Sequence, residues 1–486
     1  MPQINTSKFI LFVFIYTLIA SHSSFAAHND LPILGDSSSG FVSPAQEHAL
    51  GRAWLRQLRA QATTIDDPLT TSFIEDLIYR IAPHSEVQDH RFEFVVIDQK
   101  ELNAFAVPGG IIGINLGLFL HAKDEDEVSS VLAHELAHLS QRHFARQIEN
   151  SERQTPIAIA SLLASILLIV SNNADAGFAG LVASQAASIQ SQLAYSRDWE
   201  READREGMKT LVDSGLDPNA MSTMFEGMLN ATRYSQRPPE FLLTHPVTDS
   251  RISDAGNRAA AYPTKKRTKS FNFLILQQRA QLKYSIADTN RDAFFIKALQ
   301  NTDNLDEEDS YRYSLGSIQF ENRQYQKALN YLNTISEKNS DQPATIILKA
   351  KALNELEKSE EAIELLNKAY QLRPDNYAIA ISLAQIMSQH GQAEAALADL
   401  QRWAEKRGTD PNIWNQLAEI ANKANNLLVA YRAKSEYFFL NGEKYKALRQ
   451  LQLAVDSAAK QGSFQQHARL KQRLIQMSES KESLSL

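Results

Sequence analysis

The chain has 486 residues, which is enough for two or three domains that each bury a hydrophobic core. Its 57 acidic and 50 basic side chains give a formal net charge of -7. The two signs are interspersed along the sequence, so no basic stripe indicates a nucleic-acid partner. The chain contains no cysteine, which excludes a small disulfide scaffold.

The N-terminus has the pattern of a cleaved secretory signal peptide. Lys8 precedes an apolar run at 9–20, and Ser24 and Ala26 are the small residues that a signal peptidase reads. The alternative is a membrane anchor, but the run is well short of the roughly 20 apolar residues that span a bilayer. We therefore expect residues 1–26 to be removed and the mature protein to reach the periplasm.

The next 90 residues predict helices first and then a small sheet. The helical patterns are amphipathic, whereas the strand patterns are short, apolar and separated by a Pro-Gly-Gly turn. The helices are expected at 44–61 and 68–81 and the strands at 92–97, 103–107 and 111–115. The edge of such a sheet can receive a substrate peptide as an added strand. The alternative is that the strands are purely structural.

The sequence His134-Glu135-Leu136-Ala137-His138 has the spacing of a zinc-binding helix. Two histidines four residues apart lie one turn above each other, so both imidazoles can reach one ion. Glu135 then lies beside the metal, where it can take a proton from water that the ion acidifies. Asp124 and Glu127 resemble a capping box at the start of this helix. The alternative is a surface helix with two solvated histidines.

Two histidines leave zinc short of a ligand, so a third ligand must come from elsewhere. The metzincin extension would require Gly at 141 and His at 144, and the chain has Gln141 and Phe144. If the helix continued, His143 would lie about 140° around it from His138 and would face away from the ion. We expect His143 to be a surface histidine or one that supports a ligand.

A later helical segment offers a carboxylate ligand. Glu200 and Asp204 are four residues apart and share one helix face. Glu200 can bind zinc, and Asp204 can accept the N–H of a ligating imidazole and so fix its tautomer. Taken by itself, the segment is equally compatible with a solvated acidic helix.

Between these two motifs lies an uncharged region. Residues 154–174 are strongly apolar, and residues 176–196 are uncharged but smaller and more polar. The pattern predicts two antiparallel helices. The first is about long enough to cross a bilayer, so 154–174 can make peripheral membrane contact, or the hairpin can be buried or face a partner.

The C-terminal half is a repeat array that follows a polar, basic linker at 263–270. Alanines recur every 34 residues, which is the tetratricopeptide period, at Ala328, Ala362, Ala396 and Ala430. The period fails after Ala430, so the terminal repeats are expected to be irregular or to form a cap. We expect the array to occupy residues 271–486 and to follow a catalytic domain at 27–262.

The two metal motifs together resemble those of the HtpX-type zinc metallopeptidases, relatives of the CaaX-processing endopeptidases. The second motif reads S-R-x-x-E-x-x-A-D over residues 196–204, and Asn103-Ala104-Phe105-Ala106 is similar to the family's edge-strand segment. The signal peptide and the array are typical of periplasmic members of this family. The resemblance implies an α+β fold: a mostly helical gluzincin domain with a small sheet, followed by an α-helical tetratricopeptide solenoid.

The resemblance also implies the roles of individual residues. One zinc ion would be bound by His134, His138 and Glu200, with Glu135 as general base. Asp204 and Arg197 would support these ligands. The implied activity is proteolysis of unfolded or misassembled outer-membrane proteins, with contact to the β-barrel assembly machinery through the repeats.

The family often has a T-H-P segment where this chain has Thr244-His245-Pro246. His245 can stabilise the tetrahedral oxyanion, or it can occupy the fourth position on zinc and hold the enzyme inactive until its loop moves. The alternative is a helix-start histidine without a catalytic part.

Two functions of different class fit the sequence. The first is a periplasmic zinc endopeptidase whose repeats recruit clients or the assembly machinery. The second is an assembly chaperone in which the repeats do the work and the metal is chiefly structural. The presence of Glu135 favours the peptidase, because a general base beside the metal has no structural use.

Overall fold

A computed structural model describes residues 43–150, 167, 197–233, 240–267 and 269–480. The predicted signal peptide and, except for Leu167, the predicted hairpin at 154–196 lie outside the described residues. The signal peptide and the hairpin therefore remain predictions. Among the described residues, no helix has the length and apolar character needed to cross a membrane.

The three predicted strands form one small mixed sheet. Strands β1 (Glu93–Ile97), β2 (Ala104–Val107) and β3 (Ile111–Asn115) have the order β1-β3-β2. β1 pairs in parallel with β3, and β2 pairs antiparallel with it. β2 is therefore an edge strand, and the strand predictions are correct to within one residue.

A glycine fixes β2 against β3. A Cβ atom at Gly113 would lie 2.0 Å from the ring of Phe105, its cross-strand neighbour. The aromatic ring occupies the space that a side chain on β3 would need, and it also meets Trp54 edge-on with ring centroids 5.7 Å apart. Only glycine fits at this position, so the edge strand is held through its single large side chain.

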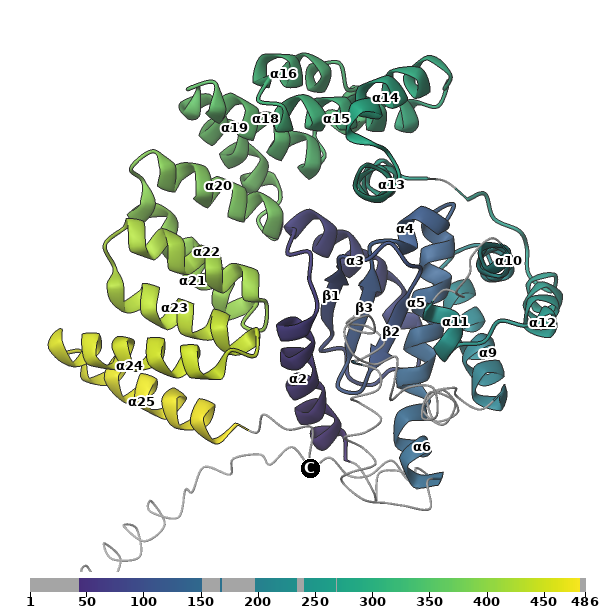
Figure 1. Ribbon diagram of the computed structural model, residues 1–486, viewed down its shortest axis with the longest axis horizontal. Coiled ribbons are helices and arrows are strands. Elements are labelled where there is room, and N and C mark those ends of the chain that lie inside the picture. Colours follow the sequence, from purple (N-terminus) through teal and green to yellow (C-terminus); the bar gives the residue numbers. More distant parts are fainter. Residues whose placement is uncertain (1–42, 151–166, 168–196, 234–239, 268, 481–486) are drawn as a thin grey trace, which may run out of the picture.

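Helices cover the sheet and complete the catalytic half (Figure 1). The sheet, α3 and α5 share the main hydrophobic core with α10, in which Ile78, Ile112 and Leu132 are fully buried. The helices, in chain order, are α2 (Pro44–Gln61), α3 (Pro68–Ile81), α4 (Leu118–His121), α5 (Glu125–Ser140), α6 (His143–Asn150), α9 (Arg197–Asp213), α10 (Asn219–Arg233), α11 (Glu240–Thr244) and α12 (Asp249–Ala259). A mostly helical domain with a small sheet is the predicted fold class.

The repeat array follows as antiparallel helices that pack mainly on their neighbours in sequence. The recurring alanines Ala328, Ala362, Ala396 and Ala430 are all buried. The array contains α13 (Phe271–Tyr284), α14 (Arg291–Gln300), α15 (Leu305–Glu321), α16 (Tyr325–Asn333), α17 (Glu337–Ser340), α18 (Pro343–Glu355), α19 (Ser359–Leu372), α20 (Tyr377–Gln389), α21 (Ala393–Lys406), α22 (Pro411–Lys423), α23 (Leu427–Leu440), α24 (Lys444–Lys460) and α25 (Phe464–Glu479).

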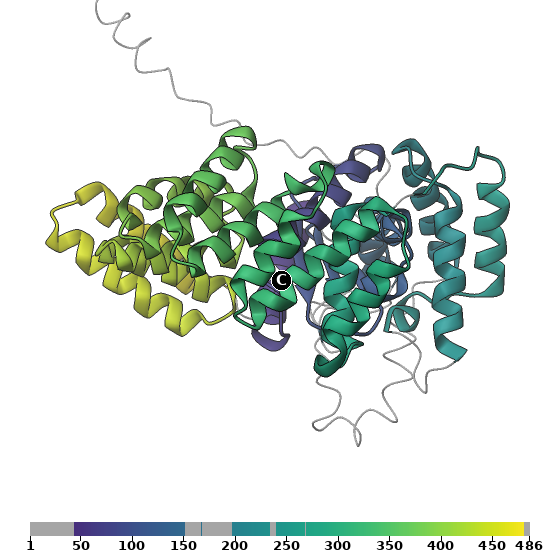
Figure 2. The same ribbon diagram turned by 90° about the horizontal axis from the view of Figure 1, so that it is seen from above.

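The array curves around the catalytic half on the side of α2 and α3 (Figures 1 and 2). Arg407 forms a two-pronged ion pair with Glu75 on α3, in which Nη1 lies 3.0 Å from Oε2. The guanidinium of Arg56 on α2 lies 4.8 Å from the ring centroid of Phe439 on α23. Polar and cation–π contacts thus hold the array against the catalytic half.

The junction between the two halves is packed at two points. Helix α13 contributes Phe273 and Leu276 to the catalytic core, whereas its Phe271 packs with the array. In the segment before α13, Arg267 lies 3.3 Å from Glu127 and 3.4 Å from Asp217. The domain boundary predicted at residue 271 remains a prediction, because α13 packs into both halves.

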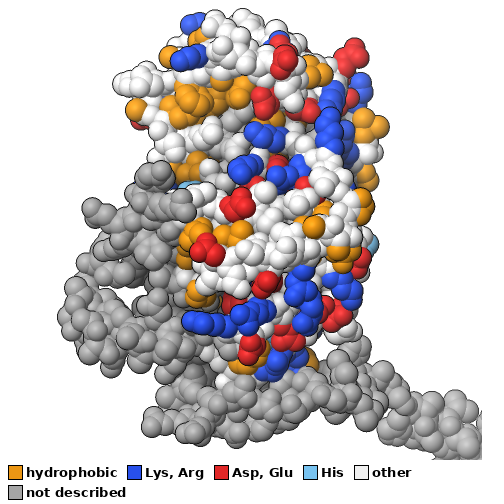
Figure 3. All heavy atoms as spheres, turned by 90° about the vertical axis from the view of Figure 1, so that its right-hand side faces the viewer, with side chains coloured by type: hydrophobic (Ala, Val, Ile, Leu, Met, Phe, Trp, Pro, Cys, Tyr) orange, Lys and Arg blue, Asp and Glu red, His pale blue; other side chains and the backbone are white. Residues whose placement is uncertain are grey.

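Charged side chains of both signs mix on the surface that carries α9, α10 and α12 (Figure 3). Lys209 with Glu86 and Arg205 with Glu206 are examples of its ion pairs. Among the described residues on this face, no broad area carries a single sign.

Candidate metal centre

Helices α5 and α9 approach closely at Gly207 of α9, which has no side chain to separate them. A Cβ atom at Gly207 would lie 3.1 Å from the backbone nitrogen of His134. Glu200, Asp204 and Gly207 follow a spacing of four and three residues, so they lie on the same face of α9. This face is buried against α5, which places both carboxylates beside the histidines of α5.

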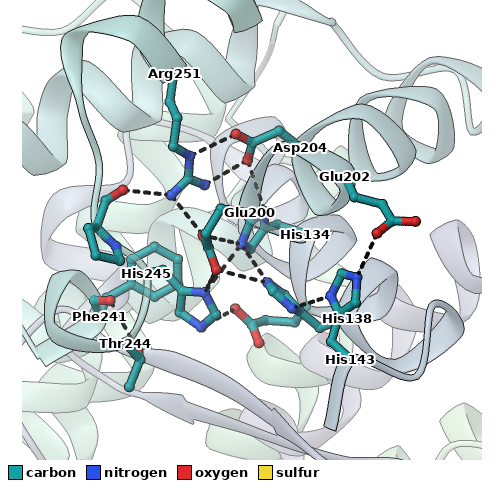
Figure 4. A network of polar contacts seen from close by, with 12 residues as sticks. His134, His138, His143, Glu200, Glu202, Asp204, Phe241, Thr244, His245 and Arg251 are labelled. Carbon is teal, nitrogen blue, oxygen red and sulfur yellow. Dashed lines mark hydrogen bonds and ion pairs between the residues drawn. The ribbon is translucent and has the colours of Figure 1, made fainter. Parts of the chain in front are cut away.

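Four buried side chains direct one donor atom each to a common point (Figure 4). Nε2 of His134 lies 3.0 Å from Nε2 of His138 and 3.4 Å from Nδ1 of His245. Carboxylate oxygens of Glu200 lie 3.0 Å from Nδ1 of His245 and 3.5 Å from Nε2 of His134 and of His138. Ligands at about 2.0–2.1 Å in a tetrahedron are about 3.3 Å apart, so this donor set has the dimensions of a zinc site.

Burial and the charges of neighbouring side chains determine which groups of the cluster are ionised. Burial lowers the pKa of His138 well below its usual value, which favours the neutral imidazole that a metal requires. Burial would raise the pKa of Glu200, but the neighbouring His245 and His134 outweigh it and hold this pKa well below the usual range. The cluster therefore presents the ionised carboxylate of Glu200 beside the neutral imidazole of His138.

Glu135 lies beside the donor atoms and is not one of them. Burial raises the pKa of its carboxyl, which accepts a hydrogen bond from the backbone N–H of Ala106. Its Oε1 lies 3.5 Å from Nε2 of His245, and no described residue forms a hydrogen bond with that oxygen. A buried carboxylate oxygen with open acceptor capacity, next to a metal-sized donor set, is suited to take a proton from water.

Asp204 orients His134, and a residue to which the sequence assigned no role holds Asp204 in turn. Oδ1 of Asp204 lies 3.1 Å from Nδ1 of His134. Two nitrogens of Arg251 donate to Asp204 at 2.7 Å each, and Nη1 of Arg251 lies 2.8 Å from Glu200. Burial lowers the pKa of His134, but the two carboxylates outweigh it and raise this pKa to about 9. Nothing in the local pattern around Arg251 indicates these contacts.

His143 is buried against the cluster and is not part of the donor set. Its Nδ1 lies 2.8 Å from Nδ1 of His138. A surface position for His143 is therefore wrong, and the other predicted alternative, support of a ligand, remains a prediction with which the contact to His138 agrees. The orientation expected from a continuous helix is also wrong, because α5 ends at Ser140 and Arg142 has a positive φ of 50°. Burial lowers the pKa of His143 to about 4.

Arg197 is not brought to the cluster. It is the first residue of α9 and is exposed, and no described contact joins it to the four donors. Its supporting role remains a prediction.

The edge strand β2 runs beside α5 and turns alternate backbone groups away from β3. The backbone N–H of Asn115 donates to the carbonyl of Asn103. In an antiparallel pair the bonded positions alternate, so Phe105 turns its N–H and C=O to β3 and Ala104 and Ala106 turn theirs outward. The hydrogen bond from Ala106 to Glu135 agrees with this alternation.

Three family models match parts of this chain. Residues 68–259 match the model of peptidase family M48, residues 353–420 match a tetratricopeptide repeat, and residues 289–369 match the model of the anaphase-promoting complex, cyclosome, subunit 3.

Two relatives match nearly the full length of this chain, and a third matches a shorter part of it. The beta-barrel assembly-enhancing protease of Escherichia coli K12 is 33% identical over 93% of this chain and 92% of its own length. The Yersinia pestis protein of the same name is 32% identical over 93% of this chain and 92% of its own length. The mitochondrial metalloendopeptidase OMA1 of Schizosaccharomyces pombe is 31% identical over 38% of this chain and 51% of its own length. These matches confirm the resemblance seen in the sequence motifs: the chain belongs to peptidase family M48, as a metallopeptidase that carries a tetratricopeptide array.

Proposed function

We propose that this protein is a periplasmic zinc endopeptidase that degrades outer-membrane β-barrel proteins when their assembly fails. The observation that carries the proposal is the convergence of His134, His138, Glu200 and His245 to within 4.8 Å of one another, with Glu135 beside them. His134, His138 and Glu200 would bind the zinc ion and leave its fourth coordination position for water or substrate. When bound, zinc would polarise the scissile carbonyl and acidify water at this position.

The residues around the metal position then have distinct tasks. Glu135 accepts the proton of the attacking water and returns it to the leaving amine, a task that suits its raised pKa. Asp204 and Arg251 hold His134 and Glu200 in place through their hydrogen bonds and ion pair. The cluster is almost fully buried, so its polar interactions are screened little by solvent.

The edge of β2 supports an extended peptide as substrate. The C=O and N–H of Ala104 and the C=O of Ala106 face away from β3, so a peptide strand can bind them beside Glu135. Recognition through the backbone suits unfolded chains with high strand propensity, among them unassembled β-barrel proteins. The name of the Escherichia coli and Yersinia pestis relatives, beta-barrel assembly-enhancing protease, supports this substrate class.

His245 closes the site in the present conformation. Its Nδ1 is within 3.4 Å of His134 and within 3.0 Å of Glu200, so it occupies the fourth corner of the donor set. A zinc site with four protein ligands has no position for water. We infer that His245 restrains the enzyme and that the segment from Thr244 to Thr248 moves to admit substrate. The contact of Arg251 with the carbonyl of Pro246, at 2.9 Å, is then one that opening must break.

The repeats recruit clients or the assembly machinery, because stacked repeats offer an extended surface for proteins without adding chemistry. Export through the predicted signal peptide would bring the protein to the compartment where such clients occur. Contact of residues 154–174 with a membrane belongs to the same proposal.

Four proteins test the proposal with purified, unfolded β-barrel protein as substrate: wild type, His245→Ala, Glu135→Gln and the double variant. We expect His245→Ala to cleave faster than wild type. We expect both proteins that carry Glu135→Gln to be inactive while still binding the substrate and zinc. Cleavage by the double variant at the rate of His245→Ala would exclude Glu135 as the base. No cleavage by any of the four proteins, with substrate binding retained, would favour the chaperone function. A slower His245→Ala would instead assign His245 to the oxyanion.

A further inference from the structure

The two histidines of α5 are supported in different ways. Nδ1 of His134 faces a carboxylate, that of Asp204. Nδ1 of His138 faces another imidazole, because Nδ1 of His143 lies 2.8 Å away. In Figure 4 the two sets of supporting side chains lie on different sides of the donor set: Asp204 and Arg251 beside His134, and His143 and Glu202 beside His138.

His143 is itself fixed on several sides. Its Nε2 lies 3.2 Å from Oε2 of Glu202, and that oxygen accepts a hydrogen bond of 2.9 Å from Arg146. The imidazole stacks on Trp199, with ring centroids 5.6 Å apart and planes 11° apart. Arg146 also lies over the ring of Trp199, 5.5 Å from its centroid. His143 has no exposed surface, and Glu202 and Trp199 of α9 contact its ring in addition to His138, so the imidazole has a defined orientation.

The direction of the hydrogen bonds follows from metal binding. A metal on Nε2 of His138 requires a neutral ring that carries its hydrogen on Nδ1. That hydrogen can be donated only if Nδ1 of His143 is an acceptor, so His143 carries its own hydrogen on Nε2 and donates it to Glu202. The chain therefore runs from His138 through His143 to the charge on Glu202, which makes the ligating nitrogen more basic.

The backbone conformation between α5 and α6 brings His143 to His138. Helix α5 ends two residues after His138, and Arg142 takes the left-handed conformation before α6 begins at His143. Without this reversal, His143 would continue around α5 and point away from His138.

We propose that His143 is a positioning residue of the metal site, which fixes the tautomer and orientation of His138 and connects it to Glu202. The inference rests on the proposed function in one respect, that His138 binds zinc through Nε2. It assigns to His143 an effect on metal affinity that does not depend on substrate or on the motion of His245.

Zinc affinity of the full chain, measured by competition with a chromophoric chelator, tests the proposal. His143→Phe keeps a ring on Trp199 and removes the acceptor. His143→Asn is the matched control, because its Oδ1 takes the place of Nδ1 and can accept from His138. We expect His143→Phe to bind zinc about 10- to 100-fold more weakly than wild type. We expect His143→Asn to stay within about threefold of wild type, since it retains the acceptor.

The outcomes separate this inference from the proposed function. If the wild type binds no zinc, the proposed metal site itself is wrong. If the wild type binds one zinc ion and His143→Phe binds equally tightly, His143 has no positioning role. Equal losses in the Phe and Asn variants would also overturn it, because they would point to packing alone. Where His143→Phe does not fold, Glu202→Gln tests the same chain, and unchanged affinity there would contradict it.

Discussion

The metal centre is held together by contacts between residues far apart in the sequence, whereas the repeat array is held together by contacts between neighbouring helices. In the centre, His134 meets Glu200, Asp204 and His245, so residues up to 111 positions apart depend on one another. In the array, each helix packs mainly on the next, as α22 does on α23 and α23 on α24. The comparison teaches that a substitution in the centre should affect several elements, whereas one in the array should affect its neighbours only.

The difference extends to the kind of interaction. The centre is a buried polar network in which carboxylates, imidazoles and Arg251 compensate one another, so the loss of one member leaves the others unpaired. The array is held by small and branched apolar side chains, such as the buried Ala362 and Leu366, and a lost contact there removes only its own share.

Arg251→Met is expected to have the largest effect on stability. The guanidinium contacts Asp204 twice at 2.7 Å and Glu200 at 2.8 Å, and only 5% of its side chain is exposed. Its removal leaves two buried carboxylates without their cation, which costs about 3–5 kcal/mol. Hydrogen exchange in the metal-free protein should show faster exchange in both α5 and α9.

Lys406→Met is the control for that substitution. Lys406 pairs with Asp375 at 2.8 Å on the surface of the array, where 86% of the Asp375 side chain is exposed. The expected change is about 0–1 kcal/mol. Equal effects of the two variants would remove the distinction between a coupled centre and an additive array.

Leu366→Ala is expected to have a somewhat smaller effect that stays within the array. Leu366 on α19 is fully buried between neighbouring repeats. The cavity left by the change costs about 2–5 kcal/mol, so α18, α19 and α20 should exchange faster while α5 and α9 keep their protection. Leu372→Ala on the same helix, where the side chain is 70% exposed, should change little. Loss of protection in α5 would show that the two halves unfold together.

Local patterns predicted much of this structure. The 34-residue alanine period located the helices of the array, and the spacing of His134 and His138 predicted a shared helix face. The strands are correct to within one residue because their apolar runs end at turn residues. Each of these signals is carried by residues close in sequence, where backbone geometry alone fixes the relation between side chains.

Contacts set by tertiary packing could not be predicted in the same way. Arg251 reaches Asp204 only because α12 lies against α9, and no spacing within α12 encodes that approach. His143 turns toward His138 because Arg142 takes a positive φ, a conformation that arginine rarely adopts. Glu200 could be predicted from the second motif, whereas nothing in that motif indicates that Glu202, two residues later, pairs with His143.

Asp67→Asn tests the junction of the two halves and, apart from the control variants, is expected to have the smallest effect. Asp67 caps α3 through the N–H of Thr70 at 2.8 Å and pairs with Arg279 on α13. Burial would raise the pKa of this carboxyl, but Arg279 and the hydrogen bonds from Thr70 outweigh it, so the net shift is downward from 3.8. A lowered folded-state pKa stabilises the protein above the unfolded value, and this contribution is lost as pH falls through the folded-state pKa.

Asparagine keeps the cap and removes the charge, so the expected cost at pH 7 is about 1.5 kcal/mol. The measurement is the difference in urea midpoint between wild type and Asp67→Asn at pH 7, 5 and 3. The difference should persist at pH 5 and shrink at pH 3, because pH 3 lies below the unfolded-state pKa of 3.8. Asp375→Asn, at an exposed site, should show no such pH dependence. A difference between wild type and Asp67→Asn that does not vary with pH would mean that the Arg279 pair contributes nothing to the junction, which would then depend on the apolar packing of α13 and on the contacts of Arg407 and Arg56.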